Sequence, residues 1–290
     1  MELISGGFLR CYGGGVWLFG KFTISSSKGS VSVKDFSPDD TAGLSKEDIE
    51  EKSKELHEEF QELQEKFYAS KKHALLIVLQ GMDCSGKDGT VRRALSGINP
   101  NGFYVENFKQ PTPLELNHDY LWRVHQKTPK RGDIVVFNRS YYEDVLVTRV
   151  HRSINDETVE RRFDEIRDFE RYLVNNDTIL LKFFLHISKD FQQKKLEERL
   201  ENPEKNWKFS AADLKERKFW DEYQHCYSDV LSHCSTKEAP WYVVPANRRW
   251  FRDYFVLSTI VKTLKELNLE FPVLDGDVRE LIKEVKNNEL

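Results

Sequence analysis

Cysteine is scarce in this 290-residue sequence, which has only Cys11, Cys84, Cys226 and Cys234. None of them forms a C-x-x-C pair, and none has finger-like spacing with a histidine. The pattern therefore indicates neither a zinc site nor a disulfide framework. We expect unreactive thiols in a protein of a reducing compartment, the cytoplasm.

Long apolar runs are also lacking. No stretch approaches the roughly 20 residues that a membrane span needs. The first 22 residues are mildly apolar, but Arg10 and the glycines at 13–15 interrupt them, and no basic leader precedes a clean hydrophobic stretch. This pattern is not typical of a signal peptide, and we expect no membrane partner.

Neither sign of charge is in clear excess, since 44 Lys and Arg face 48 Asp and Glu, a net charge of −4. A dedicated nucleic-acid or membrane-surface binder would be basic overall, so this balance argues against both classes. At 39% hydrophobic residues the chain is long enough to bury one large core or two modest ones.

Glycine is sparse too. Seven of the 15 glycines fall within the first thirty residues, so the other eight mark places where a missing side chain has a purpose. Three of those eight, Gly81, Gly86 and Gly89, lie within nine residues of one another.

The chain divides into three parts by composition. Glycine and serine clusters in residues 1–43 indicate an irregular N-terminal arm, residues 44–270 a folded domain, and residues 271–290 a helical tail. The domain begins with a Ser-x-x-Asp cap at Ser45 and a helical pattern of apolar residues. Between 37 and 70 four lysines face eleven acidic residues, which we interpret as the solvated face of this helix.

Short apolar runs alternate with helical stretches through the domain. The runs lie at 74–80, 102–108, 133–138, 178–187 and 241–245, and the helical stretches at 88–97, 113–128, 141–152, 157–175, 189–201 and 211–233. Such alternation predicts the α/β class: an open, parallel, five-stranded sheet with helices on both faces. In such a sheet the ligand lies at the carboxyl ends of the strands.

The first strand ends in "GMDCSGKDGT", where Gly81, Gly86 and Lys87 fit G-x-x-x-x-G-K. In this phosphate loop, backbone amides surround phosphate oxygens and the lysine contacts the outer ones. The helix that follows adds the positive field of its N-terminus. A plain glycine turn between strand and helix is the alternative, and the strand-loop-helix context favours the phosphate site.

The loop carries two carboxylates, Asp83 within it and Asp88 where the usual motif has Ser or Thr. A carboxylate facing phosphates needs a cation between them, and Mg²⁺ binds through one or two carboxylates plus substrate phosphates. We therefore predict Asp83 as a metal ligand. Asp88 is open to two interpretations, because an acidic first-turn residue also suits the helix dipole. A phosphatase role for Cys84 would need an arginine where Thr90 stands.

The strand at 133–138 ends in Asn138 and Arg139, with Glu143 shortly after. An acidic residue that holds magnesium usually ends this strand. Since Asn138 brings no charge, Glu143 is the candidate, although Ser140 and Glu143 also fit a capping box that opens the next helix. Residues 71–152 hold 13 basic and 8 acidic residues, which suits a site for a polyanion.

Residues 186–223 contain a helix, a break at Asn202 and Pro203, and a second helix, which predicts a flap over about 188–222. Among its many cations we single out Arg199, Lys208 and Arg217 as those that close over phosphates. The other cations of the flap are expected to lie on the solvated surface.

Together these motifs carry a resemblance. "GMDCSGKDGT", "FKQPTPLELNHDYLWRVH", "GDIVVFNRSYYEDVLVTRVH", "NWKFSAADLKERKFWDEY" and "APWYVVPANRRW" occur in the order found in the second family of polyphosphate kinases, and the likeness runs from about Val31 to about Leu269. The resemblance implies a P-loop kinase-like core with a helical lid. It also implies phosphoryl transfer between inorganic polyphosphate and nucleotides that depends on Mg²⁺, with Mn²⁺ as an alternative.

The resemblance also implies roles for single residues. Asp83 corresponds to the loop aspartate needed for the metal and for transfer, Lys87 to the phosphate-binding lysine, and Arg139 to an arginine on the phosphate path. Asn138 and Glu143 occupy two positions that vary within the family. The implied catalytic residues are Asp83, Lys87, Asn138, Arg139 and Glu143. The implied phosphate-binding residues are Gly81, Cys84, Ser85, Gly86, Lys87, Asp88, Gly89, Arg139, Arg199, Lys208 and Arg217.

The variant "FNRSxYEDVLV" resembles the subgroup that accepts both AMP and ADP, so we expect AMP to give ADP and ADP to give ATP, reversibly, with guanine nucleotides as further acceptors to test. The resemblance also implies a homo-oligomer, a dimer or tetramer. Two other functions stay open. An ATP-dependent nucleoside monophosphate kinase usually has Ser or Thr at the position of Asp88, and a non-catalytic binder of polyphosphate or nucleotide would not need Asp83 and Lys87.

Overall fold

The computed structural model describes residues 18–26 and 29–287. Its centre is a mostly parallel sheet with the strand order β1-β6-β5-β2-β4-β3. The strands are β1 (Thr23–Ile24), β2 (Ala74–Gln80), β3 (Phe103–Asn107), β4 (Ile134–Asn138), β5 (Thr178–His186) and β6 (Trp241–Pro245). The predicted α/β class with an open parallel sheet is confirmed, and all five predicted strands are present.

A sixth strand was not predicted. Thr23 and Ile24 pair antiparallel with Tyr242 and Trp241, which adds β1 to the edge of the sheet. The segment is held by buried Phe19, whose ring stacks on Phe255 with centroids 4.1 Å apart. Two strand residues within a Gly- and Ser-rich arm show no periodicity, so the sequence carries no signal for them. The rest of the predicted arm at 1–17 and 27–28, with Cys11, lies outside the described residues.

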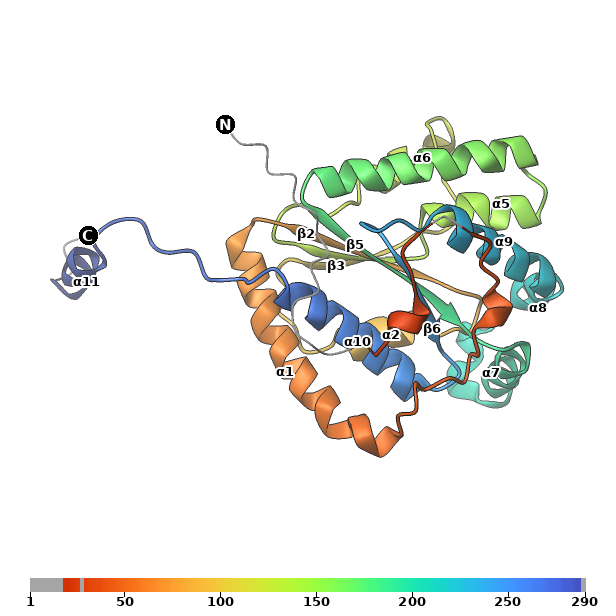
Figure 1. Ribbon diagram of the computed structural model, residues 1–290, viewed down its shortest axis with the longest axis horizontal. Helices are drawn as coiled ribbons and strands as arrows, with labels where there is room; N and C mark the ends of the chain where they lie inside the picture. Colours follow the sequence, from red (N-terminus) through yellow and green to blue (C-terminus); the bar gives the residue numbers. More distant parts are fainter. Residues whose placement is uncertain (1–17, 27–28, 288–290) are drawn as a thin grey trace.

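Helices cover both faces of the sheet, as predicted. Figure 1 shows α1, α2 and α10 on one face and α5, α6 and α9 on the other. The α-helices are α1 (Lys46–Ser70), α2 (Lys87–Ala94), α3 (Pro113–Leu116), α4 (Trp122–His125), α5 (Val147–Val150), α6 (Asp156–Asn175), α7 (Lys189–Glu201), α8 (Ala211–Arg217), α9 (Trp220–His233), α10 (Arg249–Lys265) and α11 (Val278–Asn287). The 3₁₀ turns are η1 (Gly20–Phe22), η2 (Val33–Asp35), η3 (Tyr141–Val145) and η4 (Pro203–Lys208).

The first helix begins as predicted. Ser45 and Asp48 form a reciprocal capping box at the start of α1. Ile49, Phe60 and Phe67 are buried on one face of that helix, while its acidic face is exposed. The apolar spacing therefore fixed the buried side of α1 correctly.

Three predicted helices are interrupted. The stretch 113–128 is α3 and α4 with a loop between them, 141–152 is η3 followed by α5, and 211–233 is α8 followed by α9. In the first case Asp119 accepts a hydrogen bond from the backbone amide of Leu121 at 3.0 Å. Such a local side-chain contact competes with the helical hydrogen bond and ends the pattern.

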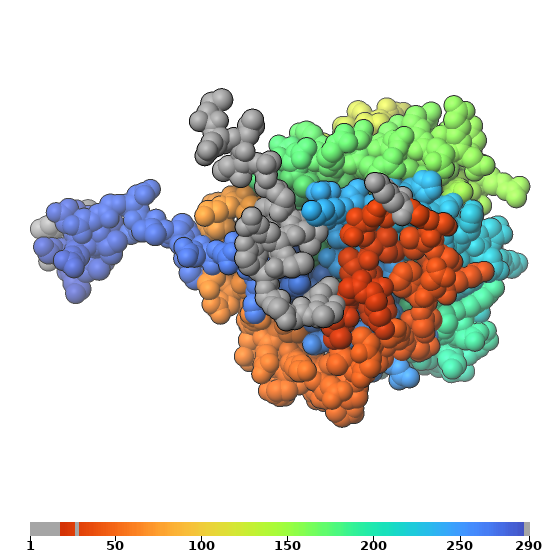
Figure 2. Space-filling view, in the orientation of Figure 1, coloured from red at the N-terminus to blue at the C-terminus, as the bar shows by residue number. Residues whose placement is uncertain are grey.

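The segment 188–222 contains α7, η4 and α8, and lies beside the carboxyl ends of the strands (Figure 1). At the other end of the chain, α11 and the residues before it project from the body, as Figure 2 shows. Among residues 18–26 and 29–287, no helix is both long and apolar enough to cross a membrane.

Candidate active site

The predicted phosphate loop joins β2 to α2, with the strand before it and the helix after it where expected. Gly81 has φ +153°, and a Cβ there would lie 2.7 Å from the carbonyl oxygen of Leu185. Gly86 has φ +95°, a backbone conformation that residues with a side chain rarely adopt, and a Cβ there would clash with the buried guanidinium of Arg252. Glycine is therefore needed at Gly81 because of the carbonyl group of Leu185 and at Gly86 because of its φ angle. A Cβ at Gly89 would meet only the flexible end of Arg93.

The loop lysine is buried. Lys87 Nζ donates hydrogen bonds to the carbonyl oxygens of Gly81 at 2.6 Å and Met82 at 3.2 Å. Burial lowers the pKa of Lys87, and Arg139 acts in the same direction, while Asp83 opposes both. The ammonium is thus held within the loop among groups of both signs.

The other predicted loop residues are not equivalent. Cys84 is partly exposed, and burial raises the pKa of its thiol to about 11, so the thiol stays protonated near neutral pH. Ser85 is fully buried, and its carbonyl oxygen accepts a hydrogen bond from Arg252 at 3.1 Å. Cys226 and Cys234 are free and buried, which agrees with the expectation of unreactive thiols.

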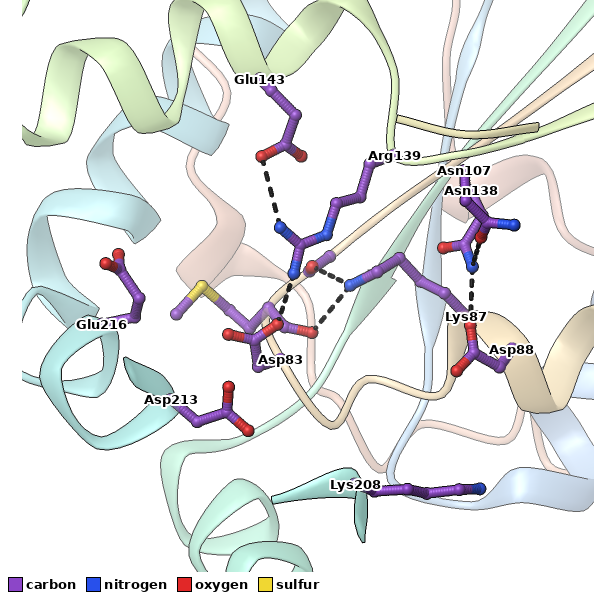
Figure 3. A network of polar contacts seen from close by, with 12 residues as sticks. Asp83, Lys87, Asp88, Asn107, Asn138, Arg139, Glu143, Lys208, Asp213 and Glu216 are labelled. Atoms are coloured by element: carbon purple, nitrogen blue, oxygen red, sulfur yellow. Dashed lines mark hydrogen bonds and ion pairs between the residues drawn. The ribbon is translucent and has the colours of Figure 1, made fainter. Parts of the chain in front are cut away.

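Asp83 contacts Arg139 across the site. An Arg139 guanidinium nitrogen donates to an Asp83 carboxylate oxygen at 2.8 Å, and another lies 4.0 Å from the Glu143 carboxylate (Figure 3). Burial opposes the charge of Arg139, but Glu143 and Asp83 together raise the pKa of its guanidinium. Arg139 has φ +64°, a left-handed conformation that costs a non-glycine residue about 1 to 3 kcal/mol. The surrounding contacts must therefore maintain this turn.

Glu143 does not form the capping box that its spacing allowed. Ser140 Oγ accepts a hydrogen bond from the amide of Tyr142 at 3.2 Å. The Glu143 side chain instead points toward Arg139, as Figure 3 shows. Burial raises the pKa of the Glu143 carboxyl, while Arg139 and Lys87 lower it. The capping-box interpretation of Glu143 is therefore wrong, and its role in metal binding stays a prediction.

Asn138 connects two neighbouring strand ends with the start of α2. Its amide donates to Asp88 at 2.6 Å and to Asn107 at 2.8 Å (Figure 3). Asp88 is thus fixed beside the ends of β3 and β4, on the other side of Lys87 from Asp83. The sequence did not single out Asn107, which lies within the predicted strand 102–108, ends β3 and pairs in register with Asn138.

Two cavities meet at this site. The first, the basic cavity, measures 1230 Å³ and extends along the loop, α7, η4 and the start of α10. Eleven cationic side chains line it against three carboxylates. The cations are Lys87, Arg92, Arg93, Lys109, Arg139, Lys195, Arg199, Lys205, Lys208, Arg249 and Arg252.

The second cavity, the acidic cavity, measures 820 Å³ and is bounded by η3, α8, α9 and the segment 108–123. Eight carboxylates and five cations line it, together with three tyrosines. The carboxylates are those of Asp83, Glu115, Asp119, Glu143, Asp144, Glu165, Asp213 and Glu216. Asp83 and Arg139 line both cavities and so stand at their border.

The three flap cations lie in different places. Arg199 and Lys208 line the basic cavity, and Arg199 donates to Asp213 at 3.0 Å. Arg217 lines neither cavity and donates to Gln192 Oε1 at 2.8 Å. Gln192 in turn donates to the carbonyl oxygen of Asp83 at 3.0 Å. Arg217 is therefore linked to the loop through a neighbour and does not face the space where phosphates would lie.

The Asp83 carboxylate at the border, with Glu143 nearby, fits a magnesium ion that is also bound by substrate phosphates. Within the described part of the chain, no three His, Cys, Asp or Glu side chains gather as a complete metal cage. Mg²⁺ typically takes one or two carboxylates, with substrate phosphates and waters completing its shell. Burial raises the pKa of the Asp213 carboxyl, and the charge of Asp83 raises it further. A cation bound at Asp83 would relieve this repulsion.

Comparisons with known proteins agree with one another. The family model described as Polyphosphate kinase 2 matches residues 43–272. An AMP/ADP-polyphosphate phosphotransferase of Meiothermus ruber is 48% identical over 246 residues, which cover 84% of this chain and 92% of the relative. An ADP-polyphosphate phosphotransferase of Rhodopseudomonas palustris is 45% identical over 79% of this chain and 83% of the relative. The crystal structure of Polyphosphate Kinase 2 from Arthrobacter aurescens TC1 has a TM-score of 0.86 at 38% identity, and the match covers 91% of this chain and 98% of that one.

Proposed function

This chain belongs to the polyphosphate kinase 2 family, and we propose that it transfers phosphoryl groups reversibly from inorganic polyphosphate to AMP and ADP. The observation that carries the proposal is the pair of oppositely charged cavities that meet at Asp83 and Arg139. The names of the Meiothermus and Rhodopseudomonas relatives support these acceptors. The match of the family model to residues 43–272 confirms the resemblance that the five sequence motifs indicated.

We assign polyphosphate to the basic cavity. Polyphosphate has no base to recognise, so a channel with many cations and few carboxylates is sufficient to bind it. Lys87 from α2, Lys195 and Arg199 from α7, and Lys208 from η4 line this channel. Their charges would hold the chain while its terminal phosphate reaches the border at Arg139.

We assign the acceptor nucleotide to the acidic cavity. A nucleotide needs groups that take its base and ribose as well as cations for its phosphate. The lining offers Tyr120, Tyr223 and Tyr227 for stacking or hydrogen bonding, and Arg123 and Arg162 for charge. The phosphate end of an acceptor would lie toward Arg139, facing the polyphosphate terminus.

The chemistry that remains for the protein is positioning and charge stabilisation. Phosphoryl transfer needs in-line geometry and neutralised oxygens, with little covalent help. Lys87 and Arg139 would hold the transferring group from two sides. Asp83, together with Glu143 through water, would hold Mg²⁺, which when bound neutralises and orients phosphate oxygens. Mn²⁺ has the same preference for oxygen ligands.

We propose that the segment 188–222 acts as a lid. Arg199 and Lys208 place positive charge from this segment over the basic cavity. Closure would exclude water, which otherwise hydrolyses the donor. Arg217 would act indirectly, because its contact with Gln192 supports the loop that carries Asp83.

The decisive assay measures ATP made from ADP and polyphosphate with no other phosphoryl donor, with AMP, GMP and GDP tested in parallel. Steady ATP formation that requires Mg²⁺ is expected. An enzyme that phosphorylates AMP only with ATP would instead be a nucleoside monophosphate kinase. Tight polyphosphate binding without turnover at any Mg²⁺ concentration would identify a non-catalytic binder.

Two further expectations remain proposals. We propose a homo-oligomer, dimer or tetramer, which light scattering of the purified chain tests. We also propose that residues 44–270 form the phosphotransferase domain, flanked by the arm and the tail. Limited proteolysis should then release a resistant fragment with those approximate bounds.

A further inference from the structure

A buried ion pair lies behind the turn that follows β4. Lys182 in the middle of β5 and Glu170 on α6 are 2.6 Å apart, and their side chains are 0% and 2% exposed. Lys182 Nζ also donates to the carbonyl oxygen of Cys234, at the end of α9, at 2.6 Å. The pair thus joins three elements inside the protein.

Two consecutive tyrosines complete the arrangement. The hydroxyls of Tyr141 and Tyr142 both donate to Glu170 Oε1, each at 2.7 Å. Lys182 donates to the Tyr142 hydroxyl at 3.1 Å. Neighbouring side chains in a regular helix or strand point in different directions, so one acceptor can serve both hydroxyls only if the backbone turns tightly. We call Tyr141, Tyr142, Glu170 and Lys182 the buried cluster.

A gain in the free energy of unfolding is a weak explanation for the presence of such a cluster. Replacing a buried ion pair by apolar side chains of similar size is often neutral or stabilising, because removing two charges from water is costly. The best-attested use of buried charge is to fix one conformation among several. The cluster does have such a conformation to fix, since η3 begins two residues after Arg139, whose backbone is in a left-handed conformation.

We propose that Glu170 and Lys182 are positioning residues for Arg139 and Glu143. They hold η3 through the two tyrosine hydroxyls. This turn contains Glu143, and Arg139 lies two residues before its start. The direction of both charged side chains toward the border of the cavities is set in this way. None of the four cluster residues lines the basic or the acidic cavity, so any effect on turnover must pass through the turn. This inference rests on the proposed function.

The mildest test removes the hydroxyls and keeps the rings. Tyr141→Phe combined with Tyr142→Phe is expected to lower kcat by about 10-fold, since a misplacement of about 1 Å can cost about 100-fold. The KM for polyphosphate is expected to stay within about twofold, because the basic cavity is formed mainly by the loop, α7, η4 and α10. Tyr172→Phe, an exposed hydroxyl on the same helix as Glu170, is the control and should change neither constant.

A second variant separates positioning from stability. The fourfold replacement Tyr141→Phe, Tyr142→Phe, Glu170→Leu and Lys182→Met makes the cluster apolar. We expect its Tm to stay near or above the wild-type value while kcat falls by about 10- to 100-fold. Wild-type kcat in a stably folded fourfold variant would overturn the proposal. If that variant does not fold, the double phenylalanine variant decides, and wild-type kcat there has the same consequence.

Coupling to the site gives a third readout. In a Glu143→Gln background, Tyr142→Phe should cost less turnover than it does alone, because both changes act through the same turn. Fully additive losses would count against positioning. A wild-type chain that makes no ATP from polyphosphate would refute the proposed function instead. In that event a crystal structure of the fourfold variant still decides, because the 2.8 Å contact between Arg139 and Asp83 should be lost, and its retention would overturn the inference.

Discussion

The guanidinium of Arg139 and the carboxylate of Asp83 form a 2.8 Å ion pair, and both residues line the basic cavity as well as the acidic one. Neither partner is deeply buried, since their side chains are 43% and 25% exposed. An ion pair with that much access to water is held weakly enough to open. We propose that Arg139 exchanges Asp83 for a phosphate when donor and acceptor occupy the two cavities.

Asp83→Asn should lower kcat about 100-fold or more, since removing a charged group that stabilises a transition state typically has an effect of this size. The fold should be retained, because the asparagine can still accept from Arg139. The measurement is ATP formation from ADP and polyphosphate, with Tm as the test of folding. Asp177→Asn, which changes an exposed ion pair with Arg131, is the matched control. Near-normal turnover in Asp83→Asn would refute the metal assignment.

Arg199→Gln and Arg217→Gln should fail in different ways. Arg199 lines the basic cavity, so its loss should raise the KM for polyphosphate about 10-fold and reduce the dependence of KM on ionic strength. Arg217 acts on the loop through Gln192, so its loss should lower kcat and leave that KM nearly unchanged. Arg171→Gln, on the exposed surface of α6, should change neither constant. An equal rise in KM for both variants would contradict the distinction.

Asn138→Asp should change the response to magnesium. The Asn138 amide lies 2.6 Å from Asp88, so a carboxylate in its place would face another carboxylate. Two such groups cannot both ionise easily without a cation, and together they bind one more tightly. The half-saturating Mg²⁺ concentration for turnover should fall about threefold or more, and Tm without Mg²⁺ should decrease. Asn138→Ala removes the amide without adding charge, so an identical Mg²⁺ response in both variants would refute this expectation.

The stability of the protein should depend on His186 in mildly acidic solution. Burial lowers the pKa of His186 from 6.5 to about 4, and its Nε2 donates to the carbonyl oxygen of Phe36 at 3.0 Å. Below pH 6.5 the unfolded chain takes up a proton that the folded chain does not, until the pH reaches about 4. Stability is therefore complete above this window and is lost as the pH falls through it, by about 3 kcal/mol.

His186→Gln tests this assignment, because the glutamine amide can still donate to Phe36. Urea unfolding at a series of pH values should show a weaker loss of stability between pH 6.5 and about 4 than in the wild type. His225→Gln, at an exposed position on α9, is the control and should keep the wild-type pH dependence. An unchanged slope in His186→Gln would show that other groups carry the acid sensitivity.

Much of the fold could be predicted from local patterns. The five parallel strands are nearly continuous apolar runs, because both faces of each central strand are covered by helices. The capping box at Ser45 could also be predicted, since its two hydrogen bonds join residues that are only three positions apart. The strand β1 and the breaks within 113–128 and 211–233 could not be predicted, because packing and single side-chain contacts decide them.

The candidate site was predictable in part for a similar reason. Gly81, Gly86 and Lys87 are close in sequence, and their spacing alone indicates a phosphate loop. Asn107 and Gln192 act through contacts with residues 31 and 109 positions away, respectively, which no local pattern records. The same holds for Arg217. Its positive charge does not distinguish it from the other cations of the flap, and only the structure shows that it contacts Gln192.

The sequence by itself determined the order of strands and helices, the phosphate loop and the kinds of charge available, because these depend on short-range spacing and residue chemistry. Only the tertiary structure decided how those charges are distributed. A chain of net charge −4 encloses a basic cavity and an acidic one, and Asp83 and Arg139 stand between them. The physical reason is that parallel strands bring their carboxyl ends to one edge of the sheet, and the buried cluster behind η3 then fixes which way the side chains at that edge point.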